Sequence, residues 1–411
     1  MMNAREIAIT SLVSAIVGAL TGLVYVALVN AMNIASGVHG IVASLSAMLT
    51  VPLSLCGGLV TGFILKHVSS EVAGPGIDAA ISAIVRRWGW IDIKTTISKF
   101  VATVSTVGMG ASGGLVGPMA QIGAGIGSFV STVLGLNQGV RKKIALVGLG
   151  AGIASVLQAP VSGALACMEI LYRGPGLEGG VLVPSLFAAF SGSIVTYLLL
   201  GGWYSRLRVA APHALLLDTK VLLCSLIIGV AGGILSRAFS KMYFSLEGAF
   251  QKLKLPLEVK PAIGCAIAAC IALAYPQVYG TGWNLVWLAM SAPSVATLTY
   301  LLIAKMLATA FTLSSGGSGG IFAPTIAMGA LVGAIVSTSM GLQRYNELMV
   351  LVGISSLLSG LCRIPLAAVV LVAEVAGGLY ALPPAIVASL VSYVVAGPKA
   401  TIYKSQLEPT T

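Results

Sequence analysis

The stretch GASGGLVGPMAQIG, residues 110–123, is a glycine-rich loop that opens a helix inside a charge-free segment. The first backbone N–H groups of a helix lack partners within the helix, and the helix dipole adds partial positive charge there. Such a loop can hold an anion, or it can merely separate two membrane helices. The stretch carries Val116 between its glycines and has no residue that ionises. The rest of the chain has to decide between the two interpretations.

The chain around this loop has the composition of a membrane protein. Of its 411 residues, 57% are hydrophobic and only 9% are charged, whereas about a quarter are charged in soluble proteins. Asp, Glu, Lys and Arg are missing from residues 7–65, 101–140 and 306–343. A bilayer-crossing helix needs about 20 apolar residues, so each run can hold more than one crossing or re-entrant helix. The runs lack the alternation of a β-barrel. They predict an all-α polytopic membrane protein.

The net charge of +11 arises from 23 Lys and Arg against 12 Asp and Glu. Basic clusters occur at residues 86–87, 141–143 and 252–260. In membrane proteins such clusters fill short cytoplasmic loops. We therefore expect a lipid bilayer and no nucleic acid as partner, and a field that favours anions over cations.

Cysteine and histidine predict no disulfide framework and no metal site. The cysteines lie inside apolar segments without a Cys-x-x-Cys pair, which is typical of small buried hydrophobic residues; they are Cys56, Cys167, Cys224, Cys265, Cys270 and Cys362. His39, His67 and His213 are scattered. The N-terminus resembles a first membrane helix more than a cleaved signal. With no catalytic set or nucleotide-binding motif visible, we expect neither an enzyme nor a cofactor.

The glycine-rich loop is duplicated. SGGLVGP (112–118) matches SGGIFAP (318–324) at an offset of 206 residues. Further matches at offsets of 206 or 205 pair Lys99 with Lys305, GPGID (74–78) with GTGWN (280–284), Pro160 with Pro365, and Glu169 with Glu374. These matches predict two related halves, residues 1–200 and 201–411, that form one integral membrane domain.

Duplication favours an anion site over mere packing. Transporters are commonly built from repeats of opposite topology, whose discontinuous helices point their N-termini toward the midplane. A single Ser-Gly-Gly stretch more often serves close helix packing. Two copies, each at the same place in its half, predict a site where backbone N–H groups hold an anion.

Membrane-embedded charges are costly and are usually functional or paired. The repeat relates Lys99 to Lys305 and Glu169 to Glu374. One interpretation is structural, with Lys–Glu pairs or loop-facing ends that fix the packing of each half. The other is that these residues shape the electrostatics of an ion pathway. We favour the structural role for Glu374 and leave both open for Lys99 and Glu169.

Four motifs in order resemble the CLC family of chloride channels and proton-coupled anion exchangers. They are AGPGIDAAI (73–81), GGLVGPMAQIG (113–123), GGSGGIFAPTIAMGALVGA (316–334) and KATIYKSQL (399–407). The resemblance spans nearly the whole chain. It implies a CLC-type fold of two inverted repeats and a homodimer with one anion pathway in each subunit. It also implies a prokaryotic-type inner or plasma membrane protein with cytoplasmic termini and no appended nucleotide-binding modules.

The resemblance also implies the site residues, position by position. The backbone N–H groups of Ile321 and Phe322 and the hydroxyl of Tyr403 would hold chloride or another monovalent anion. Pro75 would be the first-motif residue that faces the ion, and Val116 would occupy the gate position. The glycines that accompany these residues are Gly76, Gly117 and Gly320.

The departures from the family pattern bear on mechanism. Val116 stands where the family has a gating glutamate, and Ile170 stands where proton-coupled bacterial relatives tend to have a relay glutamate. Proton transfer needs a titratable group or a water chain. We therefore expect passive anion conduction, chloride first, without proton coupling. The alternative is a proton-coupled chloride or nitrate antiporter that uses other groups, such as Glu169 and Tyr403 with waters.

Pro75 and Asp78 are two further departures. Pro75 has neither the hydroxyl of the family's serine nor an N–H, and nitrate-preferring plant members have proline there. Nitrate or a broad anion preference is one reading, and a proline that only stiffens the turn is the other. Asp78 would repel anions, so we expect it to point elsewhere or to cap a helix over residues 79–87.

Overall fold

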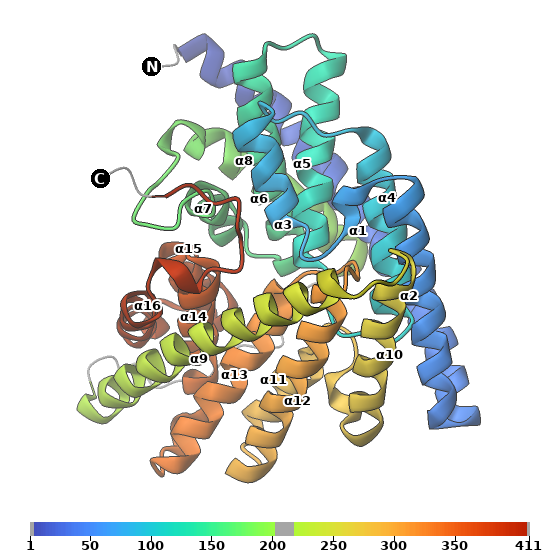
Figure 1. Ribbon diagram of the computed structural model, residues 1–411. Coiled ribbons are helices and arrows are strands. Elements are labelled where there is room, and N and C mark those ends of the chain that lie inside the picture. The colour runs from blue at the N-terminus through green and yellow to red at the C-terminus, as the bar shows by residue number, and fades with distance from the viewer. Residues whose placement is uncertain (1–3, 202–217, 409–411) are drawn as a thin grey trace.

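The computed structural model describes residues 4–201 and 218–408 and contains sixteen α-helices there (Figure 1). The first eight are α1 (Ala4–Leu45), α2 (Thr50–His67), α3 (Ile77–Arg86), α4 (Ile93–Thr103), α5 (Val116–Val133), α6 (Gln138–Leu157), α7 (Pro160–Glu169) and α8 (Leu182–Leu200). The second eight are α9 (Thr219–Lys252), α10 (Val259–Ala274), α11 (Trp283–Met290), α12 (Val295–Ser314), α13 (Phe322–Ser339), α14 (Asn346–Cys362), α15 (Pro365–Ala376) and α16 (Leu382–Ala396).

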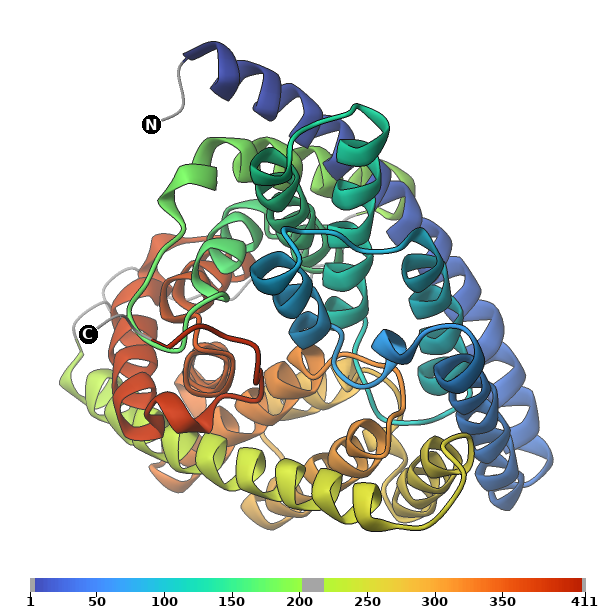
Figure 2. The ribbon, with the colours of Figure 1, turned by 45° about the horizontal axis from the view of Figure 1, so that its top comes forward.

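The helices of the two series follow one another in the same order. α5 and α13 have 18 residues each and begin at equivalent positions. α7 and α15 both begin with proline. Proline suits the first turn of a helix because it lacks an N–H group, and an N–H group at that position would have no partner within the helix. Figure 2 shows the two series, blue to green and yellow to red, side by side. The predicted division at residues 200 and 201 adjoins residues 202–217, outside the described part, and stays a prediction.

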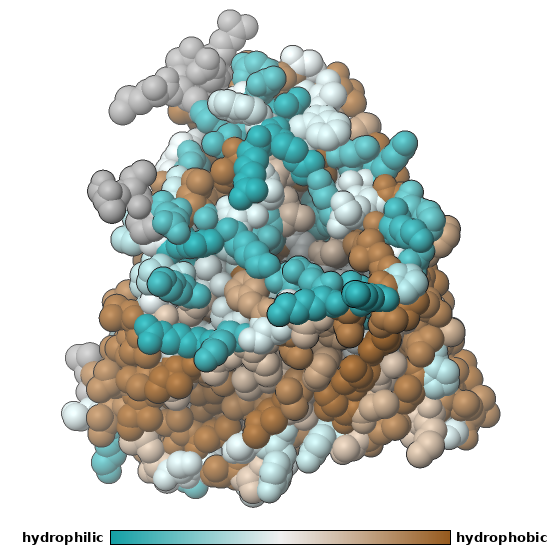
Figure 3. All heavy atoms as spheres, in the orientation of Figure 1, coloured by the Kyte–Doolittle hydropathy of each residue, from teal (hydrophilic) through white to brown (hydrophobic). Residues whose placement is uncertain are grey.

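The helices have the lengths and surface of a polytopic membrane protein. Eight helical segments among the described residues are long and apolar enough to cross a membrane. On the face seen in Figure 3, hydrophobic side chains cover the lower part of the molecule and hydrophilic side chains gather in the upper part. α3, α7 and α11 have 10, 10 and 8 residues, which reach about 15 Å or less against a core of about 30 Å. These helices are therefore too short to cross the hydrocarbon core.

Glycine sets the closest helix contacts in both series. A Cβ on Gly123 of α5 would lie 2.1 Å from the carbonyl oxygen of Gly148 in α6. Gly329 and Gly353 repeat this contact between α13 and α14, at 2.5 Å. Small residues let membrane helices approach closely enough to pack backbone against backbone. These glycines therefore let α5 pack closely against α6, and α13 against α14.

The loops before the short and inner helices meet in the middle of the molecule and pair across the two series. Isolated bridges join Gly74 with Ser318, Ser112 with Gly280, and Gly114 with Gly320. The last pair is antiparallel, with reciprocal N–H···O=C bonds of 2.6 Å. Pairing between equivalent residues of two repeats is what a local two-fold axis produces. The duplicated glycine loops thus form one central unit.

One sequence prediction about burial is wrong in part. Cys167, Cys224, Cys265 and Cys362 are buried as expected, but Cys56 in α2 and Cys270 in α10 are exposed on the surface of the chain. Both lie on apolar helices that can turn a hydrophobic side chain toward lipid as readily as toward a core. His213 lies outside the described residues.

Candidate functional site

The N-termini of α5 and α13 are the centre of the candidate site. Val116 and Phe322 are the first residues of these helices, and both side chains are buried. Leu115 and Ile321 precede them without a side-chain capping bond. By contrast, Asp, Asn, Asp and Ser side chains cap α4, α6, α9 and α12. Two helix N-termini at the centre therefore present first-turn N–H groups that no side chain of the helix cap satisfies.

The structure brings Pro75, Gly76, Gly117 and Gly320 together. A Cβ on Gly117 would lie 2.1 Å from the carbonyl oxygen of Pro75 and 2.9 Å from the Cα of Gly320. A Cβ on Gly76 would lie 2.8 Å from the carbonyl oxygen of Gly117, and Gly76 has φ of 82°. Only glycine allows these backbones to approach one another so closely. Four of the predicted site residues thus form one compact cluster.

Tyr403 reaches the centre from the C-terminal segment. Its side chain is fully buried, and its hydroxyl lies 3.7 Å from Cys362 Sγ at the end of α14. The described hydrogen bonding of this hydroxyl is therefore to α14 and not to the start of α13. The flanking residues Ile402 and Lys404 line the same cavity as Pro75 and Gly76. The residues on both sides of Tyr403 thus border the cavity that Pro75 and Gly76 also line.

The two buried lysines hold the loops. Lys99 Nζ donates to the carbonyl oxygens of Val72 and Gly74, at 2.9 Å each. Lys305 Nζ donates in the same way to Val278, Gly280 and the hydroxyl of Ser112. Each ammonium group is satisfied by backbone carbonyls, which makes its burial tolerable. The Lys–Glu pairing that the sequence left open is not what these lysines make.

The two buried glutamates cap helices of the opposite series. The Glu169 carboxylate accepts from Leu366 and Ala367 at the start of α15, and the Glu374 carboxylate accepts from Val161 and Ser162 at the start of α7. All four N···O distances lie between 2.8 and 3.0 Å. A carboxylate at a helix N-terminus satisfies orphan N–H groups and complements the dipole. Glu374 and Glu169 thus both make structural contacts, but these contacts are helix caps across the two halves and not the Lys–Glu pairs or loop-facing ends that the sequence suggested.

Ile170 and Asp78 have distinct surroundings. Ile170 caps the end of α7 with a fully buried side chain, and its carbonyl accepts from Gln406 Nε2. Asp78 lies inside the first turn of α3, and its carboxylate accepts from the Ser405 N–H at 2.7 Å. It does not cap its own helix, because Gly76 holds that position. Burial raises the pKa of Asp78, and the bond from Ser405 partly offsets this rise.

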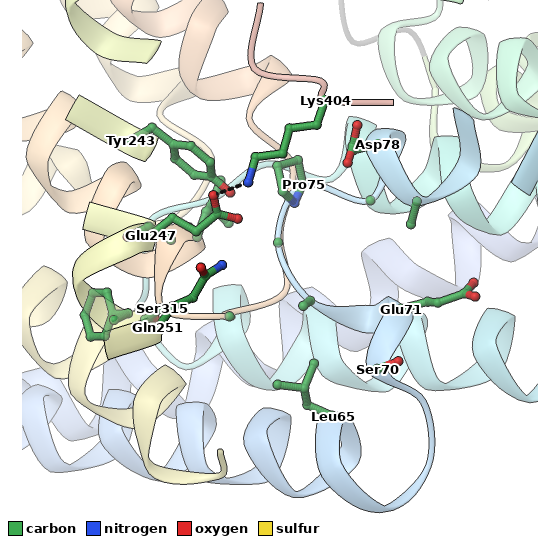
Figure 4. Close-up of a pocket in the computed structure, with 18 of the residues that line it drawn as sticks. Leu65, Ser70, Glu71, Pro75, Asp78, Tyr243, Glu247, Gln251, Ser315 and Lys404 are labelled. Carbon is green, nitrogen blue, oxygen red and sulfur yellow. Dashed lines mark hydrogen bonds and ion pairs between the residues drawn. The ribbon is translucent and has the colours of Figure 1, made fainter. Parts of the chain in front are cut away.

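A cavity of about 400 Å³ opens beside the first glycine motif. We name it the Gly74 vestibule; its lining includes Gly74, Pro75, Asp78, Tyr243, Glu247, Lys260 and Lys404. In Figure 4, Tyr243 and Glu247 of α9 face Pro75 and Asp78 across this space. Lys404 forms an ion pair with Glu247 there. This cavity is polar and carries both signs of charge.

A second cavity of about 450 Å³ opens beside the equivalent motif of the second half. We name it the Gly280 vestibule; its lining includes Tyr25, Asn33, Ser36, His39, Tyr279, Gly280, Thr281 and Asn284. Leu65, at the end of α2, lines the Gly74 vestibule, whereas Thr50, at the start of α2, bonds to Tyr279. An 18-residue helix is about 27 Å long. The two vestibules therefore lie at opposite ends of α2, with the paired loops between them.

Several residues of this region were not found from the sequence. Glu247 belongs to no motif, Lys404 lies within the motif at residues 399–407 but was not singled out, and His39 lies alone in a charge-free run. A usable signal did exist for the threonines that hold the loops, since Thr103 and Thr106 recur as Thr309 and Thr312 at the same offset. Thr106 and Thr312 accept from the N–H groups of Ser318 and Ser112.

Comparisons with known proteins show which sequences the chain resembles. A family model described as voltage gated chloride channel matches residues 57–397. A ClcB-like protein of Ralstonia nicotianae is 28% identical over 87% of this chain and 85% of that protein. The H(+)/Cl(-) exchange transporter ClcA of Salmonella agona is 27% identical over 92% of this chain and 83% of that protein.

Solved structures share the fold. The crystal structure of a CLC-type fluoride/proton antiporter matches with a TM-score of 0.88 at 22% identity, over 100% of both chains. The structure of a slow cyanobacterial Cl−/H+ antiporter matches with a TM-score of 0.83 at 23% identity, over 96% of this chain and 95% of that one. These likenesses establish the all-helical architecture predicted from the sequence.

Proposed function

This chain belongs to the voltage gated chloride channel family, known as CLC, and on that premise we propose that it conducts monovalent anions passively, chloride first. The family transports anions across membranes and does not consist of enzymes. What we propose beyond the family is that transport here is not coupled to protons.

The observation that carries the proposal is the apolar start of α5. Val116 is buried at an uncapped helix N-terminus, next to the glycine cluster. A valine cannot compete with an anion for the N–H groups, and it cannot carry a proton. Ile170, buried at the position of the relay glutamate, cannot carry a proton either. Both carboxylate oxygens of Glu169 accept hydrogen bonds from backbone N–H groups. The start of α5 offers anions a positive helix end, and neither Val116 nor Ile170 offers protons a titratable side chain.

The anion site we propose consists of the N–H groups of Ile321 and Phe322, with Tyr403 and the glycine cluster around it. Its support is the uncapped start of α13 and the burial of Tyr403 beside the Gly74 vestibule. The Lys99 ammonium group donates to the carbonyl oxygens of Val72 and Gly74, so we assign Lys99 a structural role in holding this loop.

The orientation we propose places the Gly74 vestibule and both termini in the cytoplasm. Arg141 donates to the Trp88 carbonyl, Arg87 pairs with Glu71, and Lys66 pairs with Glu258. These contacts tie the basic clusters at residues 86–87, 141–143 and 252–260 to one end of the molecule, which the positive-inside rule makes cytoplasmic. We further propose a homodimer in a prokaryotic-type inner or plasma membrane.

The test is a flux measurement with purified protein in chloride-loaded liposomes. Valinomycin sets the potential with K⁺, and external chloride and pH are recorded together. We expect chloride efflux that follows the potential, without proton movement in fixed proportion. Nitrate, bromide and fluoride in place of chloride then define the anion preference. Protons driven uphill by a chloride gradient would overturn the uncoupled mechanism.

The competing function is proton-coupled exchange through unusual groups. It is favoured by the name of the Salmonella relative and by the carboxyl groups of Asp78 and Glu247 in the Gly74 vestibule. The variants Glu169→Gln and Glu374→Gln separate the two functions, because the two residues make equivalent contacts.

For a structural Glu169, we expect both variants to lower thermal stability alike and to leave any proton flux unchanged. Weakening a charged cap costs about 1 kcal/mol. Proton coupling in the parent protein that only Glu169→Gln abolishes would instead identify Glu169 as a proton carrier.

A further inference from the structure

The Gly280 vestibule differs from the Gly74 vestibule in its charge. Among the described residues that line it, there is no Asp, Glu, Lys or Arg. Its polar side chains are neutral hydrogen-bonding groups, contributed by Tyr25, Asn33, Ser36, Thr281 and Asn284. His39 is the only histidine in this described lining, and histidine is the residue type that ordinarily changes charge between pH 5 and 8.

The imidazole of His39 is held in place by its neighbours. It packs edge-on against the Tyr279 ring, with centroids 4.6 Å apart and planes at 70°. Tyr279 is itself fixed by a 2.8 Å hydrogen bond to Thr50. A Cβ on Gly110 would lie 2.7 Å from both Cδ2 and Nε2 of His39, and Gly110 has φ of 107°. The glycine therefore makes room for the imidazole edge.

One nitrogen of this fixed ring has no protein partner. His39 Nε2 is buried and makes no hydrogen bond to any described residue. Because this atom is buried against Gly110, an anion in the vestibule does not reach it directly. A protonated imidazole would act on an anion in the vestibule through its positive charge and not through a hydrogen bond from Nε2.

We propose that the Gly280 vestibule is an anion-recruiting site in which protonated His39 attracts small monovalent anions before they enter the central loops. The neutral amides and hydroxyls of the lining complete such a site with hydrogen bonds and without competing carboxylates. The inference rests on the proposed anion pathway but not on the absence of proton coupling. It makes anion entry from this side pH-dependent although Val116 cannot titrate.

Three other groups bear on the charge of His39. Tyr279 and Tyr25 are neutral phenols at physiological pH and line the same vestibule. Lys305 donates to the carbonyls of Val278 and Gly280, which flank Tyr279. This ammonium opposes protonation of His39 and adds to the attraction for an anion. The described part of the vestibule lining contains no carboxylate that would neutralise the imidazolium.

Flux is the first measurement, with His39→Gln as the variant and His67→Gln as its matched control. His67 faces Glu258 at the other end of α2. Chloride efflux from liposomes is recorded between pH 8 and pH 5.5, after gel filtration and thermal melts have established folding. We expect the parent and His67→Gln to gain about fivefold at acid pH, the effect of one unit charge at about 4 Å in water. We expect His39→Gln to lose that gain.

The Gly74 vestibule has its own carboxyl groups, so the difference between parent and variant is the measured quantity. An acid gain in His39→Gln equal to that of the parent would overturn the proposal.

Titration by nuclear magnetic resonance is the second measurement, and it does not depend on flux or on coupling. The histidines are isotope-labelled and titrated in chloride and in gluconate. We expect chloride to raise the pKa of His39, because a bound anion stabilises the imidazolium, and to leave His67 unchanged. An equal His39 titration in both salts would exclude the site. Proton-coupled transport together with the chloride-dependent shift would instead refute only the proposed uncoupled mechanism.

Discussion

Val116 and Phe322 are equivalent residues, and each begins a helix whose N-terminus points into the paired loops. Both are buried and apolar. The N–H groups around them are the chemistry of the site, and the side chains decide only what may compete with an anion for these groups. A change at Val116 therefore tests the proposed gate directly.

We predict that Val116→Glu slows chloride flux about tenfold at neutral pH, the effect of about 1.4 kcal/mol of competition. The carboxylate would occupy the N–H groups when it is charged. Flux should rise as pH falls through the carboxyl pKa, because the protonated form no longer competes. Liposome efflux between pH 4.5 and pH 8 measures this.

The neutral variant Val116→Gln is the matched control, since it has similar size to the glutamate and no charge. It should change flux without adding a pH dependence. A Val116→Glu protein with the parent's flux and pH profile would place the gate elsewhere.

The connections between helices depend on exchanged contacts. Each lysine holds the loop of its own half, and each glutamate caps a helix of the other half.

One asymmetry between the two halves is the π-helical turn Val104–Gly108 after α4, whereas α12 continues as an α-helix to Ser314. Such turns often occur at functional sites, and Gly108 lines the Gly280 vestibule.

We predict that Lys99→Met and Lys305→Met destabilise the protein to a similar degree, on the order of 3 kcal/mol each. Each change leaves two loop carbonyls buried without their donor. Thermal unfolding in detergent measures the loss, with the exposed Lys94→Met on α4 as control. A Lys99→Met protein of parental stability but altered anion preference would restore the pathway role for Lys99.

At the scale of the whole molecule, two vestibules lie on opposite sides of the paired central loops. The Gly74 vestibule contains the Glu247–Lys404 ion pair, whose side chains are 25% and 55% exposed. Partly exposed pairs are weak and screened by salt. Their main effect is on the local potential that an entering anion meets.

We predict that Glu247→Gln raises chloride flux about fivefold at low ionic strength, because it frees the charge of Lys404. Lys404→Gln should lower flux, and both effects should shrink at high salt. Glu258→Gln, which also loses a lysine partner on this end, is the control without a place in the vestibule lining. Equal flux in all three variants would show that this ion pair does not influence anion entry.

The sequence by itself determined the helical membrane class, the duplication and the helix starts at the two glycine loops. These features are local: charge-free runs, Gly-Gly before a helix and proline in a first turn act on their own segments. Pro75, Gly76, Gly117 and Gly320, which the family resemblance assigned to the anion site, lie close together in the structure. The error in the prediction for Cys56 and Cys270 has the same local origin, because apolar surroundings in sequence do not say whether a helix face meets protein or lipid.

Only the tertiary structure decided what the buried charges do. Charge complementarity alone suggests Lys–Glu pairs. Lys99 instead donates to carbonyl groups 27 and 25 residues away in its own half. Glu169 caps a helix of the other half. A lysine is satisfied by any well-placed acceptors and a carboxylate by any free N–H groups. Which ones are near depends on how the two halves pack, and that packing also placed the lone His39 in an otherwise uncharged vestibule.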